Sequence, residues 1–469
     1  MLTQTIEEQI FLEAYDNWNL ELLFQNLANI KQIDISRQAK LSPVEKAMLR
    51  GLLAGYSPKE IANSLHWTSA SVSVALSKGV YRYVEILTNR DSNSLKSWHD
   101  IAKWLEEAGY KDKSKPHQLS IGIEKLPEDE QFYGREKELT QLKQWIVDKG
   151  DRLIVLSGML GIGKTALAVR LVRQIQSSFE YIIWQDLKYQ PCLSKVLVEI
   201  LNCFSIEEKN NDTTIDINTQ INHLLKFLQQ QKCLLILDGL ENVMAVGKIA
   251  GFYQNENKEY SQLLERISSE NHQSCLLVIS QDEPVDMPLL QREKIDLLRV
   301  IGLGKEAKQI FVDFDLLSSQ YQDKLISQHC GNPLLLKLVS EIIKNLFDGN
   351  IYHFLAANQS QKSNFIPRYF SERLKQQLKR LSKLEIEILY LLANNHKPIC
   401  FDYLQEKFYP TNNISHVIQA VSSLRRRSFI SITTSKQKTY IRINNIIKNY
   451  FIQEKYNQHF LVTKKEYNK

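Results

Sequence analysis

The chain has 469 residues, which at about 100–200 residues per domain predicts three or four domains and excludes a single small one. Hydrophobic residues make up 43% and charged residues 24%, a composition typical of packed soluble proteins that argues against global disorder. The net charge of +6 is uneven, because basic and acidic side chains number 14 and 14 in residues 1–115, 27 and 32 in 116–368, and 18 and 7 in 369–469.

The compartment is predicted from what the sequence does not contain. The N-terminus is acidic and polar, which does not fit a signal peptide, and no run approaches the ~18 apolar residues of a membrane span. The six cysteines are scattered without a C-x-x-C pair, so they suit small core residues of a reduced protein better than a disulfide framework or a metal site. We expect a cytoplasmic protein without a membrane partner.

Residues 1–115 are expected to form a helical domain with a helix-turn-helix over 41–87. Ser42 and Pro43 are typical of a helix start, and the first helix is predicted over 44–53. A second helix over 58–65, a turn and a third helix over 69–87 follow. The spacing resembles the helix-turn-helix of LuxR-type regulators.

Two functions are open for this helical domain. In a DNA reader the third helix enters the major groove, where Ser69, Ser71 and Ser73 would face bases while Lys78 and Arg82 contact phosphates. The block is net neutral, however, whereas phosphate-driven binding favours a basic face. DNA binding through residues 58–87 and docking to a protein, or a purely structural role, are therefore both retained.

A polar, charged stretch separates this domain from an α/β core. We place a linker at 116–130, the core at 131–300 and a helical extension at 301–368. Short apolar runs alternate with amphipathic stretches, the pattern of a parallel sheet covered by helices. The predicted strands are 152–157, 181–184, 233–237 and 275–280.

A phosphate-binding loop is the strongest signal in the chain. Residues 158–165 read G-M-L-G-I-G-K-T, a match to G-x-x-x-x-G-K-[S/T] between a predicted strand and a helix. Glycines at Gly158, Gly161 and Gly163 let the backbone N–H groups turn toward phosphate oxygens, and the helix N-terminus beginning near Ala166 adds positive charge. Lys164 would reach the β- and γ-phosphates, and the Thr165 hydroxyl would bind Mg²⁺.

A second acidic position completes the expected magnesium site. Asp238 ends the apolar run 233–237, which places its carboxylate at the carboxyl end of a buried strand beside the loop. Asp238 and Lys164 are the predicted catalytic residues, and Thr165 with Asp238 the predicted Mg²⁺ ligands. The next residue is Gly239, where many hydrolytic P-loop enzymes keep a second acid, and Glu241 is a weak substitute for it.

These motifs, in this order, resemble the NB-ARC class of STAND signalling ATPases. The resemblance rests on Phe132-Tyr-Gly-Arg-Glu-Lys-Glu-Leu139, the phosphate-binding loop, Leu235-Ile-Leu-Asp238, Leu277-Val-Ile-Ser280 and Gly331-Asn-Pro-Leu334. It covers about 130–450 and is strongest toward cyanobacterial members that carry an N-terminal helix-turn-helix domain of the vWA-MoxR-associated type.

The resemblance implies an ATP/ADP switch with Mg²⁺ as cofactor. It implies that Phe132, Tyr133 and Arg135 lie by the adenine and that Pro333 packs on the base or ribose. Members of the family bind ADP tightly at rest and exchange it for ATP on activation.

Two departures from the family point to slow or no turnover. The family's Thr-Ser-Arg after the fourth strand is Ile279-Ser280-Gln281 here, and glutamine lacks the charged fork that would stabilise a phosphoryl group. The Met-His-Asp motif aligns with Ile443-Asn444-Asn445, so Asn444 would replace the histidine that contacts the β-phosphate of ADP.

The basic C-terminal block is predicted to be a winged helix over 369–460, followed by a basic tail at 461–469. Helices are expected over 381–393, 401–408 and 415–427, and a wing over 429–433 and 440–443. Arg425, Arg426 and Arg427 close the third helix, where the favoured interpretation is a solvated basic face; an acidic partner, nucleic acid or the acidic core is the alternative. WD repeats, common after this point in the relatives, are not found.

The sequence therefore predicts a nucleotide-binding signalling switch that binds a protein partner or assembles with itself. The alternative is a DNA-binding transcriptional regulator gated by its nucleotide-binding core. A third reading, a hydrolytic ATPase with steady turnover, is disfavoured by Gly239 and Gln281.

Overall fold

A computed structural model describes most of the chain and divides it into two compact units. The described residues are 10–16, 18–35, 40–92, 94–111, 132–189, 191–204, 216–285, 294–316, 319–358, 364–395, 397–408, 413–435 and 437–454. The first unit comprises 1–119 with 170–180, and the second 120–169 with 181–469. The predicted linker at 116–130 and tail at 461–469 lie outside the described residues.

The first unit is helical and built on strongly capped helix starts. The side chains of Ser42 and Ser57 each accept a hydrogen bond from the backbone N–H three residues on, and the glutamate at that position accepts one from the serine's backbone N–H. Proline is the first helical residue in both capping boxes. His66 ends the second of these helices in the left-handed conformation and turns the chain into the next. The elements are η1 Leu12–Asp16, α2 Leu20–Ile35, α3 Pro43–Leu53, α4 Pro58–Leu65, α5 Ser69–Ala75, a π-helical turn Leu76–Val80, α6 Tyr81–Leu87 and α7 Asp100–Glu107.

The sheet of the second unit has five parallel strands in the order β2-β3-β4-β1-β5. Its strands are β1 Leu153–Ser157, β2 Tyr181–Asp186, β3 Cys233–Asp238, β4 Cys275–Ser280 and β5 Ile295–Arg299. The first four lie where the apolar runs predicted them. The fifth was missed, because Ile-Asp-Leu-Leu-Arg is short, carries two charges and forms a half-exposed edge.

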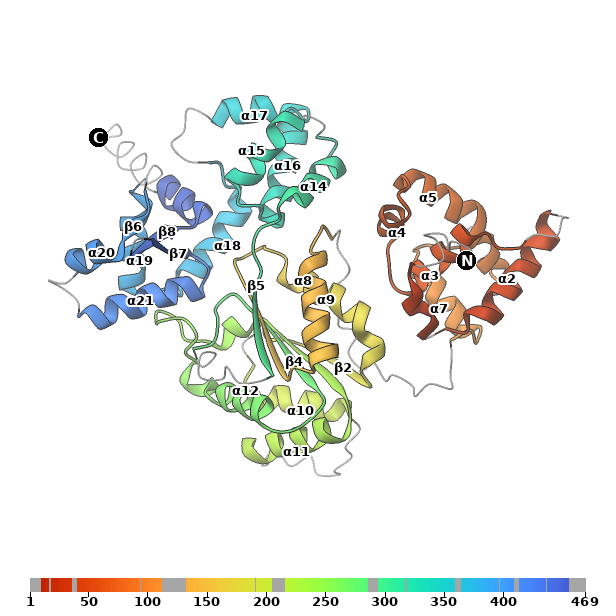
Figure 1. Cartoon of the computed structure of the whole chain (residues 1–469), viewed down its shortest axis with the longest axis horizontal. Helices are drawn as coiled ribbons and strands as arrows, with labels where there is room; N and C mark the ends of the chain where they lie inside the picture. The colour runs from red at the N-terminus through yellow and green to blue at the C-terminus, as the bar shows by residue number, and fades with distance from the viewer. Residues whose placement is uncertain are drawn as a thin grey trace, which may run out of the picture. The chain divides into compact units, whose positions relative to one another are not determined.

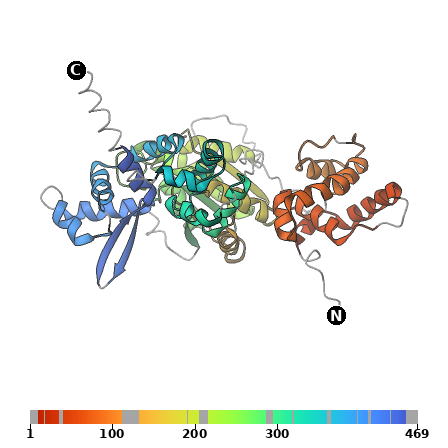
Figure 2. The ribbon, with the colours of Figure 1, turned by 90° about the horizontal axis from the view of Figure 1, so that it is seen from above.

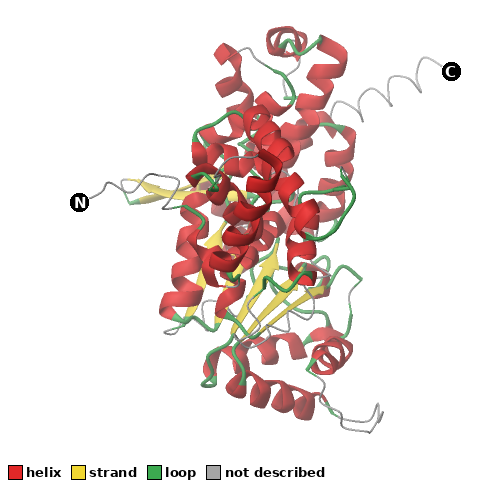
Figure 3. Cartoon of the chain, turned by 90° about the vertical axis from the view of Figure 1, so that its right-hand side faces the viewer, coloured by secondary structure: helices red, strands yellow, loops and turns green. Residues whose placement is uncertain are grey.

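Helices flank this sheet, as the yellow strands between red helices show in Figure 3. In Figure 1, α10–α12 lie around one side of the strands and α8 lies on the other. This is the layered α/β architecture that the alternating pattern predicted. The helices are α8 Glu136–Lys143, a π-helical extension Gln144–Lys149, α9 Lys164–Ile175, α10 Leu193–Cys203, α11 Ile217–Gln230 and α12 Glu259–Ser269.

Short helices follow the sheet and share one hydrophobic core with the C-terminal block. They are α14 Lys308–Asp313, α15 Ser319–Gln328, α16 Pro333–Phe347 and α17 Ile351–Asn358. The core runs from Ala307 and Phe311 through Leu336 and Phe370 to Ile446, all buried. The helices after the sheet and the C-terminal block therefore pack against each other through one continuous core.

The C-terminal block combines helices with a small antiparallel sheet of order β6-β8-β7. The β7–β8 hairpin extends from it as a two-stranded ribbon in Figure 2. The elements are α18 Arg368–Leu378, α19 Lys383–Ala393, β6 Ile399–Cys400, α20 Phe401–Phe408, α21 Ile414–Arg426, β7 Ile430–Ser435 and β8 Lys438–Ile443, with a last helix at 445–454. These lie within a few residues of the predicted helices and wing strands.

Among the described helices, none has the length and apolar content that a bilayer crossing requires.

The parallel sheet should dominate the stability of the second unit. Leu277 in β4 is 0% exposed, whereas Leu346 near the end of α16 is 75% exposed. Leu277→Ala removes buried methyl groups and leaves a cavity, so we expect a loss of about 2–5 kcal/mol in unfolding free energy. The same substitution at Leu346 should change it by no more than about 0.5 kcal/mol. Urea unfolding of both variants measures the difference, and equal losses would contradict this account of the core.

Candidate functional site

The glycine-rich loop links β1 to α9 and closes on its own lysine. The Lys164 Nζ donates to the carbonyl oxygens of Gly158 at 2.8 Å and Met159 at 3.2 Å. A side chain at Gly161, whose φ is +70°, would place its Cβ 2.8 Å from the Cβ of Leu334. Glycine is required there because the loop both adopts a left-handed turn and packs tightly on the segment around Leu334.

Thr165 and Asp238 meet beside the loop. The Thr165 hydroxyl donates to the Asp238 carboxylate at 3.0 Å, with the second carboxylate oxygen at 3.4 Å. Both are hard oxygen groups of the kind Mg²⁺ prefers, and they lie at the carboxyl end of β3 next to the lysine. The pair fits a nucleotide-linked magnesium ion.

Charge is crowded at this edge of the sheet. Burial raises the pKa of Asp238 to about 7, and repulsion from Glu241 and from Asp186, its partner on β2, adds to the rise. The Thr165 hydrogen bond and the Lys164 charge oppose it. A divalent cation would favour the charged carboxylate, so the site gains electrostatically when metal and phosphates enter together.

Lys164 is the cationic centre of the same cluster. Burial lowers the pKa of its amine, while the charges of Glu241, Asp238 and Asp282 raise it. These carboxylates surround a lysine that is 9% exposed. The loop therefore presents a desolvated cation, which can bind the anionic phosphates of a nucleotide.

Glu241 lies in the one-turn helix η6 Leu240–Val243, directly after β3. Its carboxylate accepts a hydrogen bond from the backbone N–H of Gln281 at 3.1 Å. The side chain thus bridges the ends of β3 and β4. Gly239, which precedes η6, has a positive φ of +86° and supplies no side chain for orienting water.

The segment before α8 reaches the loop through Arg135. Its guanidinium donates to the Ile162 carbonyl at 3.1 Å and to Glu138 at 2.7 Å. Tyr133 is buried, donates to Asp313 at 2.6 Å and lies beneath the Lys337 amine. Of the predicted adenine-side residues, Arg135 directly contacts the phosphate-binding loop.

The Gly-Asn-Pro-Leu segment packs on the loop from the other side. Asn332 caps α16, and its amide donates to the Leu160 carbonyl at 2.8 Å, while the Leu334 N–H donates to Gly161 at 3.3 Å. Pro333 lies between these two contacts as the first residue of α16. Its neighbours Asn332 and Leu334 thus contact the loop, and the predicted packing of Pro333 on the base or ribose stays a prediction.

Asn444 has no hydrogen bond to the phosphate-binding loop among the described residues. Its side-chain oxygen accepts from the Ile446 N–H at 2.9 Å, capping the last helix, and lies 3.9 Å from the Cys330 sulfur. Cys330 precedes Gly331, so Asn444 borders the segment that packs on the loop. Its predicted contact with phosphate stays a prediction.

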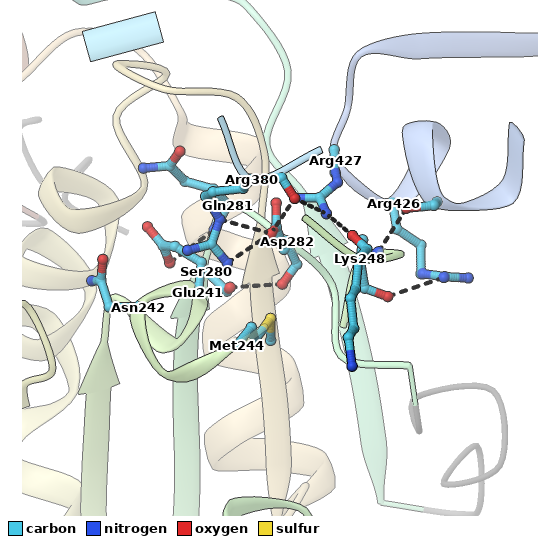
Figure 4. Close-up of polar contacts among 12 residues, drawn as sticks. Glu241, Asn242, Met244, Lys248, Ser280, Gln281, Asp282, Arg380, Arg426 and Arg427 are labelled. Carbon is cyan, nitrogen blue, oxygen red and sulfur yellow. Dashed lines mark hydrogen bonds and ion pairs between the residues drawn. The ribbon is translucent and has the colours of Figure 1, made fainter. Parts of the chain in front are cut away.

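Sequence reasoning missed two residues after β4 and misjudged one after α21. Asp282 and Glu283 are buried, and Arg427 is 0% exposed, so the expectation of a solvated basic face over residues 425–427 was wrong for Arg427. Figure 4 shows Arg427 directed at Asp282. The available signal was a run of four polar residues, 280–283, at the carboxyl end of a buried strand.

Comparisons with known proteins support a P-loop core of the NB-ARC class. Residues 135–270 match the NB-ARC domain. An uncharacterised WD repeat-containing protein of Nostoc is 34% identical over 337 residues, which cover 69% of this chain and 26% of that protein. The disease resistance protein RPS4B of Arabidopsis thaliana is 28% identical over 230 residues, covering 47% and 19%. The chain thus spans about a quarter or less of these two relatives.

Two solved structures match this chain at low sequence identity. A STAND protein with a tetratricopeptide repeat sensor from Pyrococcus horikoshii is 17% identical, with a TM-score of 0.37 over 71% of this chain and 44% of its own. A Walker-type ATPase of Pyrococcus abyssi is 13% identical, with a TM-score of 0.47 over 72% and 99%. The five-stranded parallel sheet, its phosphate-binding loop and the sequence match together support an NB-ARC-class P-loop core at residues 135–270.

The raised pKa of Asp238 makes stability depend on pH. As pH rises from the ordinary value of 3.8 toward about 7, the unfolded chain releases a proton that the folded protein keeps, so stability falls across this window and stays reduced above it. Asp238→Asn cannot ionise, so without nucleotide and Mg²⁺ we expect it to be more stable than wild type at pH 8 by about 1–4 kcal/mol. The gain should shrink toward pH 5.

Urea unfolding at pH 5, 6.5 and 8 measures this difference. Asp323→Asn is the matched control, because the Asp323 side chain is 69% exposed and should give no such pH-dependent gain. A pH-independent effect of Asp238→Asn would contradict the burial of an ionised Asp238.

Proposed function

We propose that the chain is a nucleotide-binding signalling switch in which ADP or ATP, with Mg²⁺, occupies the loop at residues 158–165. The observation that supports this most is the joint placement of Lys164, Thr165 and Asp238 at one edge of the parallel sheet. Lys164 would hold the β- and γ-phosphates, while Thr165 and Asp238 would hold Mg²⁺. Arg135 and Pro333 would frame the nucleoside side of the loop.

The proposed switch turns over slowly or not at all. Gln281 follows β4 where a charged residue would be needed to stabilise the transferring phosphoryl group, and its backbone N–H is bonded to Glu241. Gly239 offers no carboxylate for water. Bound nucleotide would therefore act by being exchanged, and hydrolysis would at most reset the switch.

The C-terminal block, proposed to be a winged helix, would respond to the nucleotide. It shares a continuous core with the helices that follow the sheet, and Asn444 borders the segment packed on the loop. The signalling output would be binding to a protein partner or self-assembly. The relatives' names, a disease resistance protein and a STAND protein with a repeat sensor, are consistent with such a role.

A direct test is the nucleotide retained by the purified protein. We expect ADP to copurify with wild type and Lys164→Ala to bind ADP about 10- to 150-fold more weakly, since a charged hydrogen-bond donor is lost. Lys226→Ala, an exposed position on α11, is the control and should bind normally. Wild-type protein without measurable affinity for ADP or ATP would contradict the proposal.

A second candidate, a DNA-binding regulator gated by the core, is favoured by the surface of the first unit. Ser69, Ser71, Ser73, Lys78 and Arg82 are all exposed. They lie on α5, the π-helical turn and α6, the stretch predicted to read DNA. The proposed helix-turn-helix would then bind duplex DNA through this stretch.

Salt titration of duplex binding tests this candidate. Neutralising Lys78 and Arg82 to glutamine should lower affinity and reduce the slope of log affinity against log salt by about 2, one for each lost phosphate contact. Lys103→Gln with Lys111→Gln removes the same charge from exposed positions elsewhere in the unit and serves as the control. Equal slopes for both double variants would argue against DNA binding through this stretch.

A further inference from the structure

Two arginines of the C-terminal region converge on one carboxylate of the core. Asp282 follows β4 by two residues, is 0% exposed, and accepts from Arg427 Nη1 at 2.7 Å and Arg380 Nη2 at 3.1 Å. All three groups are labelled in Figure 4. Asp282 Oδ1 has no hydrogen-bond partner among the described residues. The arginines therefore supply the compensating charge for this buried acid.

Arg427 is fully buried, and its guanidinium donates hydrogen bonds to acceptors on several different segments. Besides Asp282, its guanidinium donates to Glu385 Oε1 at 3.2 Å, to the Lys248 carbonyl at 2.8 Å and to the Arg380 carbonyl at 3.3 Å. Glu385 also accepts from Ser423 at 2.6 Å. A permanently charged guanidinium tolerates such burial only while its acceptors stay in place, so this network depends on the block being docked.

The neighbouring residue extends the contact to the phosphate-binding loop. Glu283 accepts from the Ser157 hydroxyl at 2.8 Å and from Arg299 Nη2 at 2.8 Å. Ser157 is the last residue of β1 and directly precedes Gly158. Asp282 itself is close enough to Lys164 to favour the charged form of that amine. Adjacent carboxylates thus reach the loop on one side and the C-terminal block on the other.

A loop of the core completes the same interface. The Ala250 N–H donates to the Ser423 hydroxyl at 2.6 Å, and Arg426 donates to the Ala250 carbonyl at 3.1 Å. The Gly247 N–H donates to the Arg380 carbonyl at 2.9 Å. Directional bonds of this kind fix the position of the block, whereas apolar contact alone would let it slide.

We propose that Asp282 and Arg427 form an ionic latch that keeps the C-terminal block docked on the core and slows nucleotide release. This rests on the proposed nucleotide-binding function. Undocking would return the charges of Asp282 and Arg427 to water. Their solvation would offset much of the lost attraction between them, so the ion pair can open when the whole block undocks. Removing one partner is different, because the remaining charge stays buried in the docked state without its shortest ion pair: among the described residues, Asp282 keeps only Arg380, and Arg427 keeps only Glu385.

The test combines two readouts on Asp282→Asn, Arg427→Met and the double variant. The first is the rate at which fluorescent N-methylanthraniloyl-ADP is released in Mg²⁺ buffer. The second is backbone hydrogen exchange at 246–251 and 420–427 without nucleotide. Asp315→Asn is the control. It breaks an ion pair with Lys344 at the surface, where the Asp315 side chain is 78% exposed.

Each single substitution should speed ADP release about 10-fold, within the usual range of coupling between sites, and raise exchange at both segments. The double variant should show less than the sum of the two effects, since both substitutions break the same Asp282–Arg427 pair. The control should match wild type. Additive effects, or wild-type release from a variant that unfolds cooperatively, would overturn the latch.

The exchange readout separates this inference from the function on which it rests. If wild type binds no ADP, the nucleotide proposal fails, and exchange alone decides whether the latch holds the block. If exchange rises in the single variants while ADP release stays at the wild-type rate, the latch holds the block without controlling the nucleotide, and the proposal as stated fails.

Discussion

Charge buried at the carboxyl edge of one parallel sheet is the constraint on which this structure depends. Asp238 and Asp282 both lie within electrostatic reach of Lys164, and none of the three is exposed. Each is tolerable only with a partner: a loop carbonyl, a threonine hydroxyl or an arginine from the C-terminal block. The positions of loop and block are therefore coupled by the same electrostatics that favour nucleotide binding.

The phosphate-binding loop is also enclosed by packing. Gly161 contacts Leu334, and Asn332 bonds to Leu160, so the helices after the sheet form one wall of the loop. Those helices share their core with the C-terminal block. A displacement of the loop would therefore disturb contacts that lead through these helices to the C-terminal block.

The sequence predicted what local pattern encodes. Four apolar runs gave four strands, and the glycine spacing located the loop with Lys164 and Thr165, because these signals repeat or fall within a few residues. β5 was missed since its edge position leaves it half-exposed and charged. Arg427 was misjudged because its acceptor Asp282 is 145 residues away, and a run of arginines looks the same in sequence whether it faces water or a buried acid.

The placement of Asp282 and Glu283 limits how the segment after β4 can evolve. The Asp282 side chain accepts from Arg427 of the C-terminal block, and the Glu283 side chain accepts from Ser157 at the end of β1, so these contacts depend on the order of two adjacent residues. Insertion or deletion of a single residue there would shift these carboxylates away from the side chains that donate to them. Both the length of this segment and the order of its two acidic residues are therefore constrained by contacts with two different parts of the second unit.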